Sequence, residues 1–280
     1  MWDNIDKLPD VHEEKPSIPI SINSVGITGY RVKATICNRE CREYHLSLEI
    51  YVDLPQTKRG VHISRFIEAV EETISKNHRN IWSLLREIAL KSLEKHVYAN
   101  KVEVYGSTEL IIESNNVVSV KQGVILGRGN DTRHYLSLSF KGVTACPCVQ
   151  KIYSYVEKTP LSNTPTHLQR TILKIEVETR GDSVLDPIEV YMVSRKAFSG
   201  VLRDKLKRYE EYLQVKEIVG NPRFVEDVVR YAAKALYDVF SDKLPRDTRL
   251  VIEARSEESI HVYDTYARLE TTIEELENVL

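Results

Sequence analysis

The hydrophobic pattern switches between two periods in each half of the chain, and this switching constrains the fold more than any other feature. From Leu46 to Val52 every second residue is apolar, as in a strand with one buried face. From Ile63 onward the apolar residues lie three and four positions apart, which is typical of helices that bury one face. Alternation returns at Val102 and Val104. The first half therefore predicts the order strand-strand-helix-helix-strand-strand.

The second half repeats this order without visible residue-level identity. Strand-like alternation recurs at 136–140, 173–177, 249–255 and 262–269. Between these strands, Asp186 and Pro187 are typical of a helix start, and Glu189 stands where the acid of a capping box would. A second helix start is predicted at Asn221-Pro222. Two such repeats predict an α+β protein with antiparallel sheets and helices packed on one face.

The repeat also predicts the domain organisation. Residues 1–16 carry five acidic side chains and are interpreted as an N-terminal surface arm. The first ββααββ-type unit is expected over residues 17–130, and the second, which carries most of the motif residues, over 131–270. The last ten residues, 271–280, are interpreted as an acidic C-terminal tail or a short terminal helix.

Charge and composition narrow the classes of partner and location. Lys and Arg number 39 and Asp and Glu number 41, so a net charge of -2 argues against bulk attraction to nucleic acid or to anionic membranes. No apolar stretch approaches the roughly 20 residues of a membrane helix, and the acidic N-terminus does not resemble a signal peptide. A cytoplasmic location is therefore expected, with the cysteines as thiols or metal ligands instead of disulfides.

The segment GVTACPC, residues 142–148, is the densest chemical signal. Pro147 restricts the directions of the two flanking thiols, Cys146 and Cys148, and a thiolate is a strong ligand for Zn²⁺ or Fe²⁺. His167, in PTHLQR, follows 19 residues after Cys148 in a polar loop before a strand. If the flanking strands pair, their ends return His167 to Cys146. Cys37 and Cys41 are two unrelated thiols or, less favoured, half of a four-thiolate zinc site.

Three polar motifs supply further candidates, each with an ordinary alternative. Glu226, in FVED, is either a helix-start acid or a carboxylate that accepts two N–H groups from a guanine-like ring. Glu258 and His261, in ESIH, form either a polar turn or an acid/base pair. His62 and Arg65, in RGVHISRF, are either a plain helix start or a phosphate-binding one. Neither a P-loop nor a strand-linked GxGxxG nor a GxSxG occurs.

Taken together, five motifs resemble those of GTP cyclohydrolase IB, and most closely its archaeal, MptA-type branch. They span residues 59 to 261 in the order RGVHISRF, GVTACPC, PTHLQR, NPRFVEDVVR and ESIH. The resemblance implies the tunnelling fold, in which each subunit carries two ββααββ-type units. It also implies a homo-oligomer, a dimer or tetramer, with active sites between subunits.

The resemblance further implies a metal centre. Cys146 matches the metal-binding and catalytic cysteine, and His167 matches the histidine ligand. The third ligand matches Glu211, although the segment reads LKRYEE where the family has an LKRPDE-like sequence, and Glu210 competes with it. One divalent ion per subunit is expected, with Fe²⁺ favoured and Mn²⁺ or Zn²⁺ as alternatives, because thiolate and imidazole accept all three.

The same resemblance implies roles for the remaining residues. Glu226 matches the acid that anchors the purine ring, and His261 with Glu258 matches the catalytic ESIH motif. The implied reaction is metal-assisted hydrolysis at C8 of GTP, with His261 transferring protons, followed by release of formate and closure of a dihydropterin. In the archaeal branch the product is 7,8-dihydroneopterin 2',3'-cyclic phosphate, formed with release of diphosphate on the route to methanopterin-type cofactors. The bacterial branch forms dihydroneopterin triphosphate for folate.

Three alternative interpretations remain at this level. A nitrile reductase of queuosine synthesis would use the cysteine as a covalent nucleophile and would need no metal. A non-catalytic assembly protein would hold structural zinc at Cys146, His167 and an acid, but it would have no use for Glu226 and His261. An α+β domain with ordinary polar residues would bind no metal.

Overall fold

The computed structural model describes residues 9–38, 40–129, 131–181 and 183–280. Its strands are hydrogen-bonded in chain order, β1 to β8, in an eight-stranded sheet. The chain divides into two compact units. The first comprises the residues up to Thr108 together with Gln122–Arg133, and the second comprises Glu109–Lys121 and His134–Leu280.

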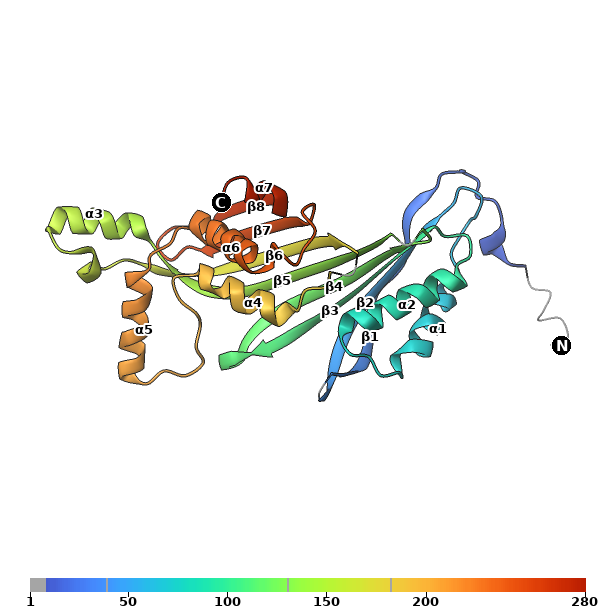
Figure 1. Cartoon of the computed structure of the whole chain (residues 1–280), viewed down its shortest axis with the longest axis horizontal. Coiled ribbons are helices and arrows are strands. Elements are labelled where there is room, and N and C mark those ends of the chain that lie inside the picture. The colour runs from blue at the N-terminus through green and yellow to red at the C-terminus, as the bar shows by residue number, and fades with distance from the viewer. Residues whose placement is uncertain (1–8, 39, 130, 182) are drawn as a thin grey trace. The chain divides into compact units, whose positions relative to one another are not determined.

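Strands β1 to β3 and two helices make up most of the first unit. In β2 the side chains alternate between buried and partly exposed, and the buried positions include Leu48, Ile50 and Val52. Helices α1 and α2 bury most of the predicted stripes, including Phe66 and Leu84, and lie on one face of these strands (Figure 1). Ile63, at the start of the first stripe, is 44% exposed. The elements of the first half of the chain are β1 (Ile22–Cys37), β2 (Cys41–Leu54), α1 (Ile63–Ile74), α2 (Ile81–Lys95), β3 (Lys101–Ile112) and β4 (Asn116–Gly127).

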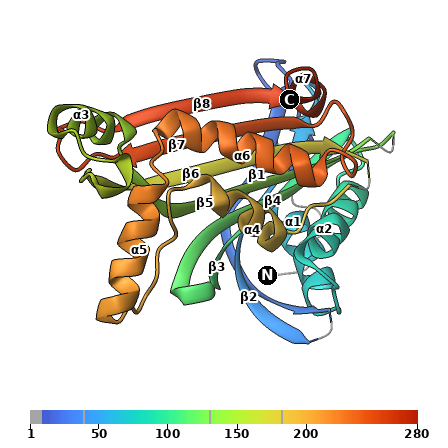
Figure 2. The same cartoon turned by 60° about the vertical axis from the view of Figure 1, so that its left-hand side comes forward.

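The second unit contains an antiparallel β6-β7-β8 sheet against which α6 packs (Figure 2). The sequence places apolar residues on one face of this helix, and most of that face is buried, whereas Val239 is 38% exposed. The buried residues of the predicted face are Val225, Val228, Val229, Ala232 and Leu236. The elements are β5 (Thr132–Ala145), α3 (Pro147–Glu157), β6 (Leu168–Arg180), α4 (Pro187–Ser194), α5 (Arg208–Gly220), α6 (Val225–Phe240), β7 (Arg249–Glu257), β8 (Thr265–Thr272) and α7 (Ile273–Glu277).

The predicted α+β class and its antiparallel pairing are confirmed. The first half has the order β1-β2-α1-α2-β3-β4, and the second half adds α3 and α5 to the corresponding order. Neither added helix has the clean apolar stripe that marks α1 or α6: α3 buries only Gln150, and α5 buries only Ile218. Hydrophobic periodicity alone therefore gave no signal for them.

Two local predictions about helix starts are wrong. The helix predicted to start at Asn221-Pro222 is α6, and it starts three residues later, at Val225, after the N-cap Phe224. The Phe224 backbone N–H donates to the Asp227 carboxylate. Asp186 does cap α4, accepting from the Ile188 backbone N–H. Glu189 completes no capping box there, since its carboxylate pairs with Lys243 at 3.2 Å.

The prediction for Cys37 and Cys41 is also wrong. The two residues are register partners where β1 turns into β2, and their sulfur atoms form a disulfide. The pairing of adjacent strand ends places the two Cα atoms 4.0 Å apart, a proximity that a CxxxC spacing does not reveal. This disulfide excludes the four-thiolate zinc site, because Cys37 and Cys41 are bonded to each other and cannot act as thiolate ligands.

The end of the chain forms the short helix α7, one of the two alternatives predicted for the last ten residues. Thr272 caps it in a capping box with Glu275, and Ile273 and Leu276 are buried. Among the described residues, no helix combines the length and apolarity needed to cross a membrane.

Candidate active site

The end of β5 carries Cys146 at the N-cap of α3, with Pro147 in the first helical position. Proline suits this position because its missing N–H would have no intrahelical partner there. The Cys146 N–H donates to the carbonyl oxygen of His167 at 3.2 Å, and the Thr166 hydroxyl donates to the Cys146 carbonyl oxygen at 2.6 Å. Two backbone contacts therefore bring the GVTACPC and PTHLQR motifs together.

The ESIH motif lies beside His167. Antiparallel pairing of β6 with β7 places Arg170 opposite Glu257, so the loops at these strand ends are neighbours. The His167 Nδ1 lies 3.1 Å from the Ser259 hydroxyl, a contact that orients the imidazole. Sequence reasoning did not single out Ser259, although it stands inside the motif that was recognised.

Within ESIH, the two predicted residues have different surroundings. Glu258 is partly buried, and its carboxylate accepts a hydrogen bond from the Thr265 hydroxyl at 2.9 Å. His261 is exposed, and its ring is stacked on Tyr263 with centroids 5.1 Å apart. The structure thus fixes the carboxylate and leaves the imidazole accessible to a ligand.

The thiol of Cys146 is free and half-buried, and it makes no capping hydrogen bond to α3. Cys148 is also free, and it is exposed. Thiolate and imidazole are donors that Zn²⁺ and Fe²⁺ accept. The donor chemistry at Cys146 and His167 therefore fits a metal ion.

Glu226 follows a segment that is hydrogen-bonded to the end of β5. The Arg223 N–H donates to the Ala145 carbonyl oxygen at 2.9 Å, so the segment before α6 is fastened to the end of β5. Arg223 also stacks its guanidinium over the Tyr231 ring at 3.7 Å. Glu226 follows in the first turn of α6, where its carboxylate is exposed. The acid predicted to anchor a purine ring is therefore free to accept hydrogen bonds from a ligand.

The two acids of LKRYEE differ in their contacts. The Glu210 carboxylate accepts the Lys207 backbone N–H at 2.8 Å and caps α5, whereas the Glu211 side chain is exposed. The structure does not gather Cys146, His167 and Glu211 into a metal-holding group within one chain. Among the described residues, one group of three potential ligand side chains lies within 4.8 Å, and it is in the other unit.

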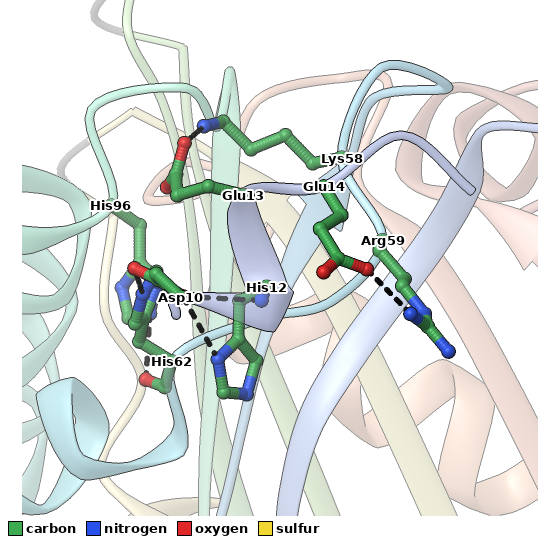
Figure 3. Close-up of polar contacts among 8 residues, drawn as sticks. All are labelled: Asp10, His12, Glu13, Glu14, Lys58, Arg59, His62 and His96. Atoms are coloured by element: carbon green, nitrogen blue, oxygen red, sulfur yellow. Dashed lines mark hydrogen bonds and ion pairs between the residues drawn. The ribbon is translucent and has the colours of Figure 1, made fainter. Parts of the chain in front are cut away.

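That group surrounds His62, the N-cap of α1. Its Nε2 lies 2.9 Å from the carboxylate of Asp10, which also contacts His12 (Figure 3). The hydrogen bond from His62 lowers the pKa of Asp10. The helix start that was predicted to bind phosphate thus already holds a carboxylate, with the partly exposed Arg65 in the next turn.

The comparisons with known proteins identify the family. A family model described as type I GTP cyclohydrolase folE2 matches residues 8–267. The chain belongs to this family. The GTP cyclohydrolase MptA of Aeropyrum pernix is 34% identical over 280 residues, covering 96% of this chain and 98% of the relative. The GTP cyclohydrolase MptA of Methanococcus maripaludis is 30% identical over 307 residues, covering 97% of both.

Solved structures agree on the fold of this cyclohydrolase family member. A uricase from Bacillus fastidious matches with a TM-score of 0.53 at 8% identity, covering 92% of this chain and 96% of that one. The uricase from Arthrobacter globiformis matches with a TM-score of 0.50 at 11% identity, covering 89% and 92%. At such identities the likeness shows the fold alone, and the tunnelling fold implied by the resemblance is confirmed.

The glycine of GVTACPC has a packing role that can be tested. A Cβ at Gly142 would lie 2.2 Å from the ring of Phe198, which is 3% exposed and packs edge-on against Phe140. We expect Gly142→Ala to lower the free energy of unfolding by about 1–3 kcal/mol, as overpacking of a core does. Urea denaturation measures this loss. Gly220→Ala, where a Cβ meets no atom within 4 Å, should leave stability unchanged or higher, and equal stability of both variants would contradict the argument.

Proposed function

We propose that this chain is a metal-dependent GTP cyclohydrolase that forms 7,8-dihydroneopterin 2',3'-cyclic phosphate, with release of formate and diphosphate. The observation that carries the proposal is the meeting of three motifs at one strand end: the free thiol of Cys146, His167 against its backbone, and Ser259 of ESIH against the His167 ring. Membership of the GTP cyclohydrolase family supplies the substrate class and the reaction.

Cys146 and His167 would hold the divalent ion, with Glu211 as the third protein ligand. The ion would lower the pKa of water and make it a nucleophile at neutral pH. We propose Fe²⁺ as the native metal, with Mn²⁺ and Zn²⁺ as functional substitutes. The hydrogen bond between Ser259 and the His167 Nδ1 supports His167 as a ligand, since it leaves Nε2 as the coordinating nitrogen.

The remaining residues would bind and protonate the substrate. Glu226 would accept two N–H groups of the guanine ring in a bidentate contact. His261, exposed beside Tyr263, would transfer protons to the ring nitrogens, and the hydrogen bond from Thr265 would hold the Glu258 carboxylate in place.

Arg65 is proposed to contact the phosphates at the start of α1, and His62 would contact them there only in place of its hydrogen bond to Asp10. The backbone N–H groups of a helix start and the guanidinium of Arg65 suit phosphate oxygens. The active sites are proposed to lie between subunits of a homo-oligomer in the cytoplasm. The absence of a complete three-ligand group around Cys146 among the described residues of one chain is consistent with a site completed on assembly. Size measurement by light scattering, in the presence and absence of GTP, tests the oligomer.

Anaerobic turnover of GTP tests the proposed function. Protein purified without oxygen receives Fe²⁺, Mn²⁺ or Zn²⁺ in turn, and formate release and pterin fluorescence after oxidation are followed. Metal-dependent formate supports the proposal, and mass analysis of the pterin distinguishes the cyclic phosphate from the triphosphate. Folded protein that yields no formate with any of the metals would refute it and favour a structural-zinc protein or a metal-independent nitrile reductase.

The choice between the two acids of α5 gives a second test. We expect Glu211→Gln to weaken metal binding on the order of 10–100-fold and to lower turnover accordingly, because an amide oxygen replaces a charged ligand. The matched variant is Glu210→Gln, which weakens only the cap on Lys207 and should keep both metal and turnover. Metal titration of both proteins decides the matter. Normal binding by Glu211→Gln together with impaired binding by Glu210→Gln would reverse the assignment.

A further inference from the structure

A segment near the N-terminus is fastened to the start of α1 within the first unit. The Gly60 N–H donates to the His12 carbonyl oxygen at 3.3 Å, and the Arg59 N–H donates to the Glu14 carbonyl oxygen at 2.9 Å. The Arg59 guanidinium also pairs with the Glu14 carboxylate at 2.6 Å (Figure 3). These contacts hold the short helix η2 (Val11–Glu13) in place. Consequently the His12 ring lies beside the His62 ring, with centroids 4.7 Å apart.

Asp10 lies between the two histidines. One carboxylate oxygen is 2.9 Å from the His62 Nε2, and the other is 3.3 Å from the His12 Nδ1. The ligand atoms of all three side chains lie within 4.8 Å of one another. Ligands placed about 2.0 Å from a tetrahedral Zn²⁺ are separated by about 3.3 Å. The cluster is therefore already near the spacing of a metal-ligand set.

Burial and hydrogen bonding determine which nitrogen of His62 faces this cluster. The Nδ1 of His62 is buried without a partner among the described residues, so Nε2 is the nitrogen directed at the cluster. The His62 side chain is 16% exposed, and its carbonyl oxygen lies 3.3 Å from the His96 Nε2, which helps to fix the helix start. Asp10 and His12 are each 48% exposed. One ligand is thus held by the fold, and the opposite side is open to solvent cations.

We propose that Asp10, His12 and His62 form a divalent-metal site that uses none of the side chains proposed to bind metal at Cys146. Two imidazoles and one carboxylate are donors for Zn²⁺ or Fe²⁺, and three protein ligands leave a coordination position for water or an anionic oxygen. The ion joins the N-terminal segment to the start of α1. It replaces the hydrogen bonds that Asp10 makes to the two rings and converts a solvent-exposed contact into a cross-link.

Metal titration in a Cys146→Ser background isolates this site. Metal-free protein is titrated with Zn²⁺ in a calorimeter and with Co²⁺ by absorption spectroscopy at neutral pH. We expect Cys146→Ser to bind one ion per chain with a Co²⁺ spectrum lacking a thiolate charge-transfer band, and the double variant His12→Gln/Cys146→Ser to bind none. Zn²⁺ should raise the melting temperature of the first protein and not of the second.

A second variant separates ligand loss from loss of docking. Glu14→Gln in the same Cys146→Ser background removes the ion pair with Arg59 but leaves all three ligands, so it should retain the ion. Absence of binding by Cys146→Ser, or equal binding by the His12→Gln double variant, would overturn the proposal and leave Asp10 in plain ion pairs. The result does not depend on the proposed cyclohydrolase, because it is read without GTP and without the thiol at position 146.

Discussion

Cys146→Ser should abolish GTP turnover while the protein stays folded. Activation of water by a bound metal ion is worth several kcal/mol, and each 1.4 kcal/mol corresponds to a factor of ten in rate. We therefore expect formate release to fall about 10³-fold or more, together with loss of the metal at this centre. Formate assays on the metal-reconstituted variant, with metal content measured in parallel after removal of loosely bound ions, check both parts.

Folding of this variant is expected to be preserved for a structural reason. Cys146 is the N-cap of α3 and makes no capping hydrogen bond with its side chain. Serine is among the best N-cap residues and can stabilise a helix start by about 1 kcal/mol. A structural zinc site would behave in the opposite way, because removal of one ligand would unfold the protein. Circular dichroism melting curves distinguish these outcomes.

The matched control for this prediction is Cys148→Ser, two residues further along the same helix. Cys148 is exposed and free, so the substitution should leave both metal content and formate release close to the unsubstituted level. Full turnover by Cys146→Ser, or the same large loss in both variants, would be incompatible with Cys146 as the single thiolate ligand.

Much of the fold could be predicted because its signals are local. Alternation in β2 and the stripes of α1 and α6 follow directly from which face of each element is buried. Helices α3 and α5 were missed because each buries a single side chain and so leaves no periodic pattern. The disulfide of Cys37 with Cys41 was missed because it depends on the register of two strands.

In the candidate site, too, local features could be predicted and contacts between distant segments could not. The sequence motifs identified the candidate side chains. Whether His167 returns to Cys146 depended on strand pairing, and the structure shows that it does, because the Cys146 N–H donates to the His167 carbonyl oxygen. The cluster of Asp10 with His12 and His62 joins positions 52 residues apart in the chain. The sequence showed an acidic arm there, and nothing in its composition indicated the backbone contact between Gly60 and His12 that brings the two rings together.

Glu226→Gln should produce the second large loss, and it should do so through purine recognition. Glu226 is exposed in the first turn of α6, on a segment that Arg223 fastens to the end of β5. Hydrogen bonds to a charged group contribute about 1.5–3 kcal/mol each, so replacing the carboxylate by an amide should lower kcat/KM for GTP about 10²-fold. Steady-state formate assays over a range of GTP concentrations measure this.

Comparison of GTP with ITP makes the test specific to base recognition, because inosine lacks the exocyclic amino group that a carboxylate would bind. The unsubstituted enzyme should prefer GTP, and Glu226→Gln should reduce that preference, which a purely structural defect would leave intact.

The neighbouring Asp227 supplies the control: it accepts the Phe224 N–H at 3.1 Å and pairs with Arg230, so Asp227→Asn should lower stability by about 1 kcal/mol or less and keep the GTP preference. An unchanged GTP-to-ITP ratio in Glu226→Gln would mean that another group reads the guanine edge. Both acids lie in the first turn of α6, where Asp227 caps the helix and Glu226 is exposed to solvent. Comparing the two variants therefore distinguishes an effect on helix capping from an effect on substrate binding.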